Sequence, residues 1–228
     1  MKNIYLDNAA TTEIDIEVID VMVKTMRNNF GNPSSIHSEG RKTRSLIEES
    51  RKKIADLLNS SPSEIFFTSG GTEADNMAIR GAVRDAGVRH IITSKIEHAA
   101  VINTVANLES KKKVTTSFVK LNEDGEIDLE NLEYLLSNNS NVLVSLMHGN
   151  NEIGNLLDIE KVSLLCKKYG ALFHSDTVQT IGHYNFDLSK TKIDFLACSA
   201  HKVHGPKGVG FLYINKNVDI TPLIHGGS

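Results

Sequence analysis

A lysine and an aspartate each follow a short apolar run, at points where a parallel sheet would open toward a ligand. Lys202 comes after the run 193–197, and Asp176 comes after the run 171–174. A lysine at the mouth of a buried sheet can form a Schiff base with an aldehyde. An acid at the end of a buried strand costs free energy unless a positive group, such as a protonated ring nitrogen, pairs with it. The plainer alternatives are a lysine that extends to solvent and an aspartate that caps the next segment.

A glycine turn follows another apolar run, residues 65–68. Gly70 and Gly71 let the backbone approach a ligand closely, and the free N–H groups at the start of the following helix could bind a phosphate. The alternative is an ordinary turn in which Thr72 caps that helix.

Two further strand ends carry polar side chains. His98 follows the run 91–93 and could stack its flat ring on an aromatic ligand, or it could be a plain surface histidine. Asn150 and Asn151 follow the run 142–147. Paired asparagines suit a turn as well as the donation of hydrogen bonds to a ligand oxygen, so the residues leave both readings open.

Together these groups match the needs of one cofactor, pyridoxal 5'-phosphate (PLP). PLP requires a lysine for its aldehyde and an acid for its pyridinium nitrogen. It also needs a phosphate cradle, and a flat side chain to stack on is useful. Lys202, Asp176, the 70–72 turn and His98 supply these four groups. Asp176 would keep the ring nitrogen protonated, and Lys202 would hold the cofactor and later move a proton. We therefore expect a PLP enzyme, with no metal site.

Short apolar runs alternate with amphipathic stretches over most of the chain. Two helices come first, one with apolar residues at helical spacing from Ile14 to Met26 and one over about 37–58. Such alternation beyond Pro62 predicts an α/β fold, a mainly parallel seven-stranded sheet with helices on both faces and ligands at the carboxyl ends of its strands. The expected strands are 65–68, 91–93, 114–119, 142–147, 171–174, 193–197 and 209–214, and the expected later helices are 72–83, 97–108, 129–136 and 159–168.

Composition narrows the class of protein. The chain has 228 residues, 40% hydrophobic and 23% charged, which allows one sizeable core or two small domains. A net charge of −3 argues against a nucleic-acid surface. No apolar run approaches the roughly 18 residues of a membrane span, and Asp7 comes too early for a signal peptide. Two cysteines, Cys166 and Cys198, are too few for a disulfide scaffold, so we expect a cytoplasmic protein with buried thiols.

Six segments resemble those of the NifS/IscS-type cysteine desulfurases, which are fold-type I PLP enzymes of the class V aminotransferase group. They occur in order and at family-like spacing, from residue 4 to the end of the chain. A small departure at 175–179 (SDTVQ) keeps Asp176 and Gln179. The segments are 5–12 (YLDNAATT), 30–35 (FGNPSS), 67–76 (FTSGGTEADN), 97–98 (EH), 147–154 (MHGNNEIG) and 199–202 (SAHK).

The resemblance implies roles for nine residues around the cofactor. Lys202 carries the Schiff base, Asp176 pairs with the ring nitrogen, and His98 stacks on the ring. The other six contact the ring oxygen or the phosphate: Asn151 and Gln179 the oxygen, and Gly71, Thr72, Ser199 and His201 the phosphate.

The resemblance also implies an architecture and an activity. We expect a three-layer PLP-dependent transferase large domain at 15–228 and an N-terminal segment, 1–14, that packs with a small domain. Family members are homodimers that take sulfur from L-cysteine and leave alanine. They pass a persulfide to a sulfur-acceptor or scaffold protein for iron–sulfur clusters and thiolated tRNA, without binding a membrane.

In the family, the persulfide cysteine and the arginine that holds the substrate carboxylate lie beyond the point that matches Ser228. Neither Cys166 nor Cys198 matches the persulfide cysteine. We therefore expect an incomplete enzyme that is inactive by itself. One alternative is a non-catalytic PLP-binding fragment, which the length of the gene product would test. The other is a selenocysteine lyase or another class V enzyme, which the sequence of the second half would distinguish.

Overall fold

A computed structural model describes residues 4–226, so positions 1–3 and 227–228 of the expected domain ranges lie outside the described residues. Seven strands form one sheet in the order β1-β7-β6-β5-β4-β2-β3. Strands β2 to β6 are mutually parallel, and β7 runs antiparallel to both of its neighbours, β1 and β6. The predicted mainly parallel, seven-stranded sheet is confirmed. The strands are β1 (Ile65–Thr68), β2 (His90–Thr93), β3 (Thr115–Phe118), β4 (Val142–Ser145), β5 (Leu172–Asp176), β6 (Phe195–Ser199) and β7 (Gly210–Ile214).

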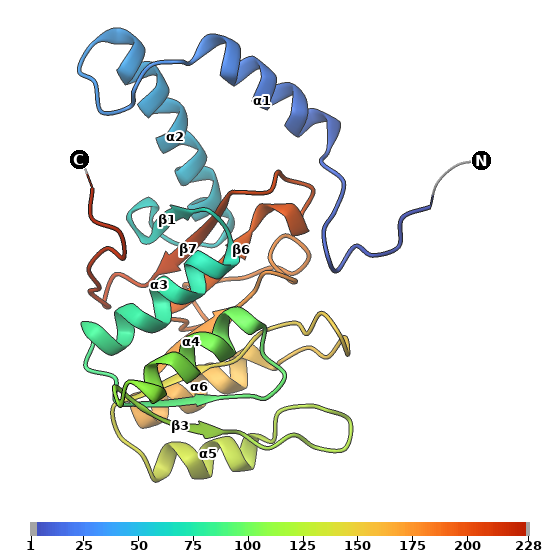
Figure 1. Ribbon diagram of the computed structural model, residues 1–228, viewed down its shortest axis with the longest axis vertical. Helices are drawn as coiled ribbons and strands as arrows, with labels where there is room; N and C mark the ends of the chain where they lie inside the picture. Colours follow the sequence, from blue (N-terminus) through green and yellow to red (C-terminus); the bar gives the residue numbers. More distant parts are fainter. Residues whose placement is uncertain (1–3, 227–228) are drawn as a thin grey trace.

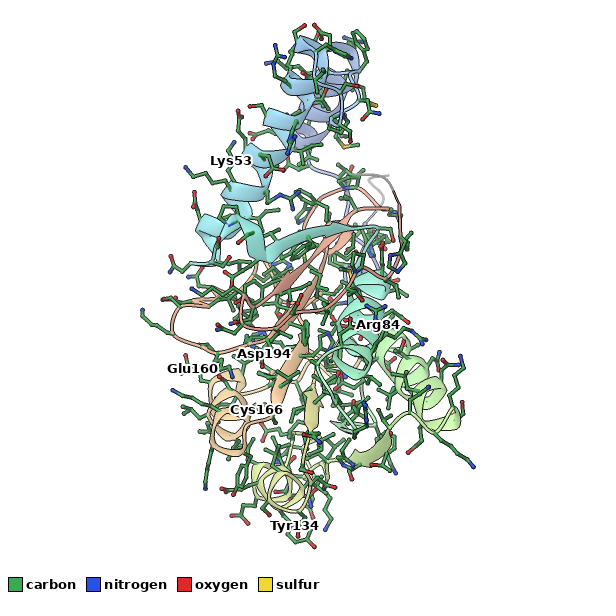
Figure 2. The ribbon with its side chains drawn as sticks, turned by 90° about the vertical axis from the view of Figure 1, so that its left-hand side faces the viewer. Lys53, Arg84, Tyr134, Glu160, Cys166 and Asp194 are labelled. Carbon is green, nitrogen blue, oxygen red and sulfur yellow. The ribbon has the colours of Figure 1, made fainter. Side chains whose placement is uncertain are left out.

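Helices cover both faces of the sheet. In Figure 1, α3 and α4 lie in front of the strands, and the view of Figure 2, turned by 90°, places α5 and α6 on the opposite side. Helices α1 and α2 extend away from the sheet at one end, and α1 contains no buried residue. The helices are α1 (Ile16–Asn28), α2 (Ser38–Leu57), α3 (Gly71–Arg84), α4 (Ala99–Ser110), α5 (Leu129–Ser137) and α6 (Ile159–Tyr169).

Alternation along the strands divides the core into two clusters. Ile91 of β2 packs with α3 and α4, whereas the next residue, Ile92, packs in the cluster that includes α5 and α6. Phe195 and Leu196 of β6 divide between the clusters in the same way. Successive side chains of a strand point to opposite faces, so a strand that is covered on both sides must be apolar throughout. This explains why the strands read as continuous apolar runs.

Two strands extend further than their apolar runs predict. Strand β5 continues past His174 to Asp176, and β6 continues to Ser199. The polar residues stay in the sheet because they find buried partners: the Ser175 hydroxyl donates to the Leu146 carbonyl at 2.8 Å, and His174 Nδ1 lies 2.8 Å from Ser145 Oγ. As a result, the polar residues at these strand ends lie at the edge where a parallel sheet binds ligands.

No helix among residues 4–226 is long and apolar enough to cross a membrane.

Candidate functional site

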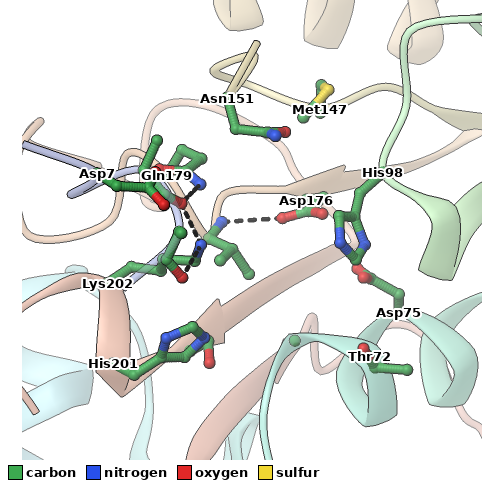
Figure 3. A pocket seen from close by; sticks show the side chains of 15 residues that line it. Asp7, Thr72, Asp75, His98, Met147, Asn151, Asp176, Gln179, His201 and Lys202 are labelled. Atoms are coloured by element: carbon green, nitrogen blue, oxygen red, sulfur yellow. Dashed lines mark hydrogen bonds between the residues drawn. The ribbon is translucent and has the colours of Figure 1, made fainter. Parts of the chain in front are cut away.

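A cavity of about 480 Å³ lies at the carboxyl ends of the strands. Figure 3 shows its lining, with Asp176 between Lys202 and His98. All nine residues that were singled out from the sequence line this one cavity, although their roles toward a cofactor are not tested by this placement. They are Gly71, Thr72, His98, Asn151, Asp176, Gln179, Ser199, His201 and Lys202.

The glycine turn brings backbone close to the cavity. Gly70 has a φ of 147°, a conformation that L side chains rarely adopt, and α3 begins at the next residue, so Gly70 and not Thr72 occupies the cap position. A Cβ on Gly71 would lie 2.7 Å from Val178 Cγ2, so this position also requires glycine. The start of α3 presents unpaired backbone N–H groups and the positive end of the helix dipole. An anion is the ligand that this arrangement favours.

Asp176 is the buried acid of the cavity. Its Oδ1 accepts a hydrogen bond from the Val178 backbone N–H at 2.9 Å. The pKa of Asp176 is raised to about 7, first by burial and then by the charge of Asp75, against the opposing effects of the Val178 hydrogen bond and the charges of His174 and His98. A cation at the ring position would favour the ionised form, because an opposite charge at close range lowers a carboxyl pKa.

Lys202 is held by the N-terminal segment of the chain. Its Nζ donates to the carbonyl oxygen of Ala10 at 2.8 Å and also to that of Ala9. Gln179 Nε2 donates to the same Ala9 carbonyl at 2.9 Å. Burial lowers the pKa of Lys202, and the charges of Asp176 and Asp7 oppose that shift. A lowered amine pKa increases the neutral, nucleophilic fraction.

The segment itself is fixed to the turn that carries Lys202. The Thr12 N–H donates to the His201 carbonyl at 2.8 Å, and the Thr12 hydroxyl accepts from the His204 N–H at 2.8 Å. His201 Nδ1 lies 3.1 Å from Thr11 Oγ1. Burial lowers the pKa of His201, and the charges of Lys202 and Lys207 lower it further, so the ring is neutral at pH 7.

His98 and Asn151 reach the cavity from two loops. His98 is the N-cap of α4, and its Nδ1 accepts from the Ala100 N–H at 3.1 Å, which leaves the proton on Nε2 and fixes the ring. The Asn150 side chain donates from Nδ2 to the Ile96 carbonyl, and its Oδ1 accepts from two backbone N–H groups of its own turn. Asn151, by contrast, lines the cavity. The structure thus separates the two asparagines that the sequence left undecided.

Both cysteines are buried and free. Burial raises the pKa of Cys198 to about 12 and that of Cys166 further still, so neither is a thiolate at neutral pH. The expectation of inert core thiols agrees with this environment. Among residues 4–226, no group of three or more His, Cys, Asp or Glu side chains could hold a metal ion.

Comparison with known proteins decides the family. Residues 4–228 match the family described as aminotransferase class-V. The chain belongs to this family. Its similarity to cysteine desulfurases extends over its whole length. It is 46% identical over 230 residues to a protein named cysteine desulfurase IscS from Dictyoglomus turgidum, covering all of this chain and 58% of that protein. It is 44% identical to a putative cysteine desulfurase IscS 1 from Bacillus subtilis, covering all of this chain and 60% of that protein.

Solved structures of similar proteins share the fold. A structure named NifS-like protein aligns with a TM-score of 0.94 at 42% identity, over 99% of this chain and 63% of that one. A structure described as SspA in complex with cysteine aligns with a TM-score of 0.93 at 36% identity, over 99% and 65% of the two chains. The expected NifS/IscS-type transferase fold is therefore confirmed. The chain spans less than two thirds of the length of these relatives.

The class-V cavity also contains residues that sequence reasoning missed: Asp7, Ala9, Ala10, Asp75, Met147 and Val178. Ala9 and Ala10 have no chemical side chain, and only their place within the 5–12 motif pointed to them. Asp75 carried a signal, because it is an acid on the apolar face of α3 among Ala74, Ala78 and Ile79. An acid in such a place must be paired or protonated.

The residues present fit PLP. Gly71 lets the turn pack closely against Val178 of the cavity wall, where a Cβ would collide with it, and the turn lies at a helix start that favours an anion. Asp176 is a buried acid, and among the described residues its hydrogen bond comes from the backbone N–H of Val178 rather than from a cationic side chain. A pyridinium nitrogen could therefore act as its cationic partner. The Lys202 amine is half-buried and shares the cavity with both groups. Aldehyde, ring nitrogen and phosphate thus each have a candidate partner.

Proposed function

We propose that this protein is a PLP-dependent cysteine desulfurase that takes sulfur from L-cysteine and yields alanine. The single observation that carries the proposal is the cavity in which the Lys202 amine, the Asp176 carboxyl and Gly71 at the start of α3 come together. Aminotransferase class-V membership and the names of the relatives support the same chemistry. This activity is proposed for the whole protein, because the chain spans only 58% and 60% of the length of those two relatives.

Each wall of the cavity has a proposed task. The start of α3 would bind the phosphate through Gly71 and Thr72, with Ser199 and His201 on the opposite side. Asn151 and Gln179 would bind the ring oxygen. When bound, PLP supplies an electron sink for the bonds at a substrate Cα.

The chain's own groups would orient the cofactor and move protons. Asp176 would stay ionised and hold a proton on the ring nitrogen. His98, with its proton on Nε2, would lie against the ring face. Lys202 would bind the aldehyde carbon, and its free amine would then carry a proton to or from the substrate Cα. The Ala9 and Ala10 carbonyls would hold that amine in place when it is free.

Sulfur transfer needs one group more, a thiolate that attacks the substrate sulfur. Cys166 and Cys198 are buried with raised pKa values, so we propose that neither performs this step. The persulfide would instead form on a cysteine outside residues 1–228. We further propose that a sulfur-acceptor or scaffold protein receives the sulfur for iron–sulfur or thio-cofactor assembly, and that the reaction takes place in the cytoplasm, where reduced thiols persist.

We also propose a homodimer built on this large domain, residues 15–228, with residues 1–14 packing against a small domain. The exposed apolar residues of α1, which contains no buried residue, support the need for a further covering surface: Ile16, Ile19, Val21 and Met26. The oligomeric state, measured by sedimentation at several concentrations, tests this part separately.

Cofactor mapping tests the central proposal. Protein incubated with PLP should absorb visible light, and borohydride should then fix the cofactor on the Lys202 peptide. Lys207 is the matched control, because it also borders the phosphate side of the site. Label on the Lys207 peptide, or no label at all, would contradict the proposal. A Lys207→Ala protein should still be labelled at Lys202.

A further inference from the structure

A buried aspartate and a buried histidine face each other behind the cavity. Asp75 lies on α3, which packs against β5, and His174 lies on β5 two residues before Asp176. His174 Nε2 is 3.3 Å from Asp75 Oδ1, and the two side chains are 0% and 1% exposed. The distance suits an ion pair, and neither the Asp75 oxygens nor His174 Nε2 have a hydrogen-bond partner.

An ionised Asp75 with no hydrogen bond would be costly at this depth. Transfer of an unpaired carboxylate out of water costs so much that the group binds a proton or acquires a partner instead. His174 Nδ1 lies 2.8 Å from Ser145 Oγ, which can accept a hydrogen from it. If Nδ1 donates to Ser145, one further proton between Nε2 and Oδ1 satisfies both facing atoms. The pair then carries no net charge, whether the proton is closer to nitrogen or to oxygen.

The charge on Asp75 matters because Asp75 lines the same cavity as Asp176. In Figure 3 its carboxyl points toward His98 and Asp176. A negative Asp75 raises the pKa of Asp176, and it does the same to Glu97. The charged and titratable groups near the pair are Asp176 on β5 and Glu97 and His98 before α4, and Lys202 and Asp7 line the same cavity.

We propose that Asp75 and His174 are positioning residues that hold one proton between them, so that Asp176 alone faces the ring nitrogen as a carboxylate. The effect on the cofactor rests on the proposed function, whereas the shared proton is a property of the protein without cofactor. The directions of the two pKa shifts agree with this state, because burial raises the pKa of Asp75 and lowers that of His174. Taken together, the two shifts leave the pair with one proton between about pH 4 and pH 8.

The shared proton can be measured without cofactor. In protein labelled with ¹⁵N-histidine, the ring nitrogens of His174 report which of them carries hydrogen. We expect Nδ1 to stay protonated and the ring to show no transition near pH 6.5, the ordinary histidine value. We expect a single change at alkaline pH, when the pair loses its proton. The wild-type titration alone decides this point, so no variant has to fold for it.

The isosteric variant Asp75→Asn identifies the partner. It should abolish the alkaline change of His174, because an amide cannot release the proton. An ordinary His174 transition near pH 6.5 in the wild type, or an alkaline change that persists in Asp75→Asn, would overturn the inference.

A second measurement, on PLP-loaded protein, tests the positioning role. The visible absorbance of the bound cofactor changes with pH, and its midpoint should stay within about 0.3 pH unit of the wild-type value in Asp75→Asn, because the shared proton already leaves the pair without net charge. Asp124→Asn, in an exposed turn, is the control and should leave the midpoint unchanged. A midpoint lower by about one pH unit in Asp75→Asn would show that Asp75 carries a negative charge beside Asp176 and would overturn the inference.

The two proposals fail in different ways. A protein that shows the shared proton but never binds PLP would contradict the proposed function and leave the pair intact. A protein that binds PLP on Lys202 while His174 titrates as an ordinary imidazole would overturn this inference alone.

Discussion

The Lys202 side chain donates a hydrogen bond to the carbonyl oxygen of Ala10 at 2.8 Å, across 192 residues of sequence. The contact exists because Thr12 binds the backbone of the turn that carries Lys202, through the His201 carbonyl and the His204 N–H. The N-terminal segment is therefore a wall of the candidate site. Its backbone atoms, rather than its side chains, make the contact.

Thr12→Ala should weaken the attachment of the N-terminal segment to the turn that carries Lys202. The Thr12 hydroxyl is buried, and its loss leaves the His204 N–H without its acceptor, at a cost of about 1–3 kcal/mol. We expect a lower thermal midpoint together with faster loss of bound PLP in dialysis. Thr191→Ala, away from the cavity, should leave cofactor loss unchanged. Equal effects of both substitutions would show that the segment does not support the site.

Asp176→Asn should remove the carboxylate that holds the ring nitrogen protonated. PLP should still bind through Lys202 and the helix start, but exchange of the substrate Cα proton with solvent should slow by orders of magnitude. Exchange of deuterium into a bound amino acid, followed by NMR, measures this. Asp124→Asn, in an exposed turn, is the control. Exchange at the wild-type rate in Asp176→Asn would remove this residue from the mechanism.

Gly71→Ala should create a steric conflict with the Val178 side chain. The new Cβ would lie 2.7 Å from Val178 Cγ2, so the valine or the turn must move, at a cost of about 1–3 kcal/mol. We expect weaker PLP binding and a lower free energy of unfolding in urea. Adding Val178→Ala removes the atom in conflict and should restore part of the binding. Gly226→Ala, with open space around it, should change neither quantity. Failure of the double variant to recover would place the cause elsewhere.

The protein without cofactor should lose stability as pH rises from about 6.5 to 8, above the range in which the buried His148 and His174, whose pKa values burial lowers to about 4, act in the opposite direction. Burial raises the pKa of Glu97 to about 8 and that of Asp176 to about 7. Over this range the folded protein keeps protons that the unfolded chain has already released, so each such group lowers the free energy of unfolding by about 1.4 kcal/mol per pH unit. Urea unfolding at a series of pH values measures the slope.

Glu97→Gln should make that slope shallower by one proton, because the amide oxygen can still accept from Ser94 and from the Met147 N–H. A wild-type protein whose stability is flat or rises between pH 6.5 and 8 would contradict the buried, protonated acids. So would a variant with an unchanged slope.

Residues 1–228 alone should release no sulfide from cysteine above the rate of free PLP, even when they bind the cofactor. Cys166 and Cys198 are the chain's two thiols, and both are buried with raised pKa values. Sulfide and alanine production should be equal in the wild-type chain and in a Cys166→Ala/Cys198→Ala variant. Robust turnover that this double variant abolishes would show that one of these thiols does the chemistry.

Local pattern determined most of the fold, and the residue types at the strand ends together with the family resemblance indicated nine of the fifteen residues that line the cavity. Apolar runs and helical periodicity depend on near neighbours, so the seven strands and six helices could be predicted to within a few residues. Strand ends in a parallel sheet meet at one edge, which is why residues such as Lys202 and Asp176 could be assigned to one site before any contact was known.

Tertiary structure decided what depends on contacts between distant segments. Strand β5 reaches Asp176 because buried partners from β4 satisfy its polar residues. Asn150 supports a turn while Asn151 lines the cavity, and no local pattern separates two identical side chains in sequence. The contact of Ala10 with Lys202 and that of Asp75 with His174 join segments that lie about 100 residues apart or more. Only the packed chain brings these groups together, and burial then sets which of them carry protons.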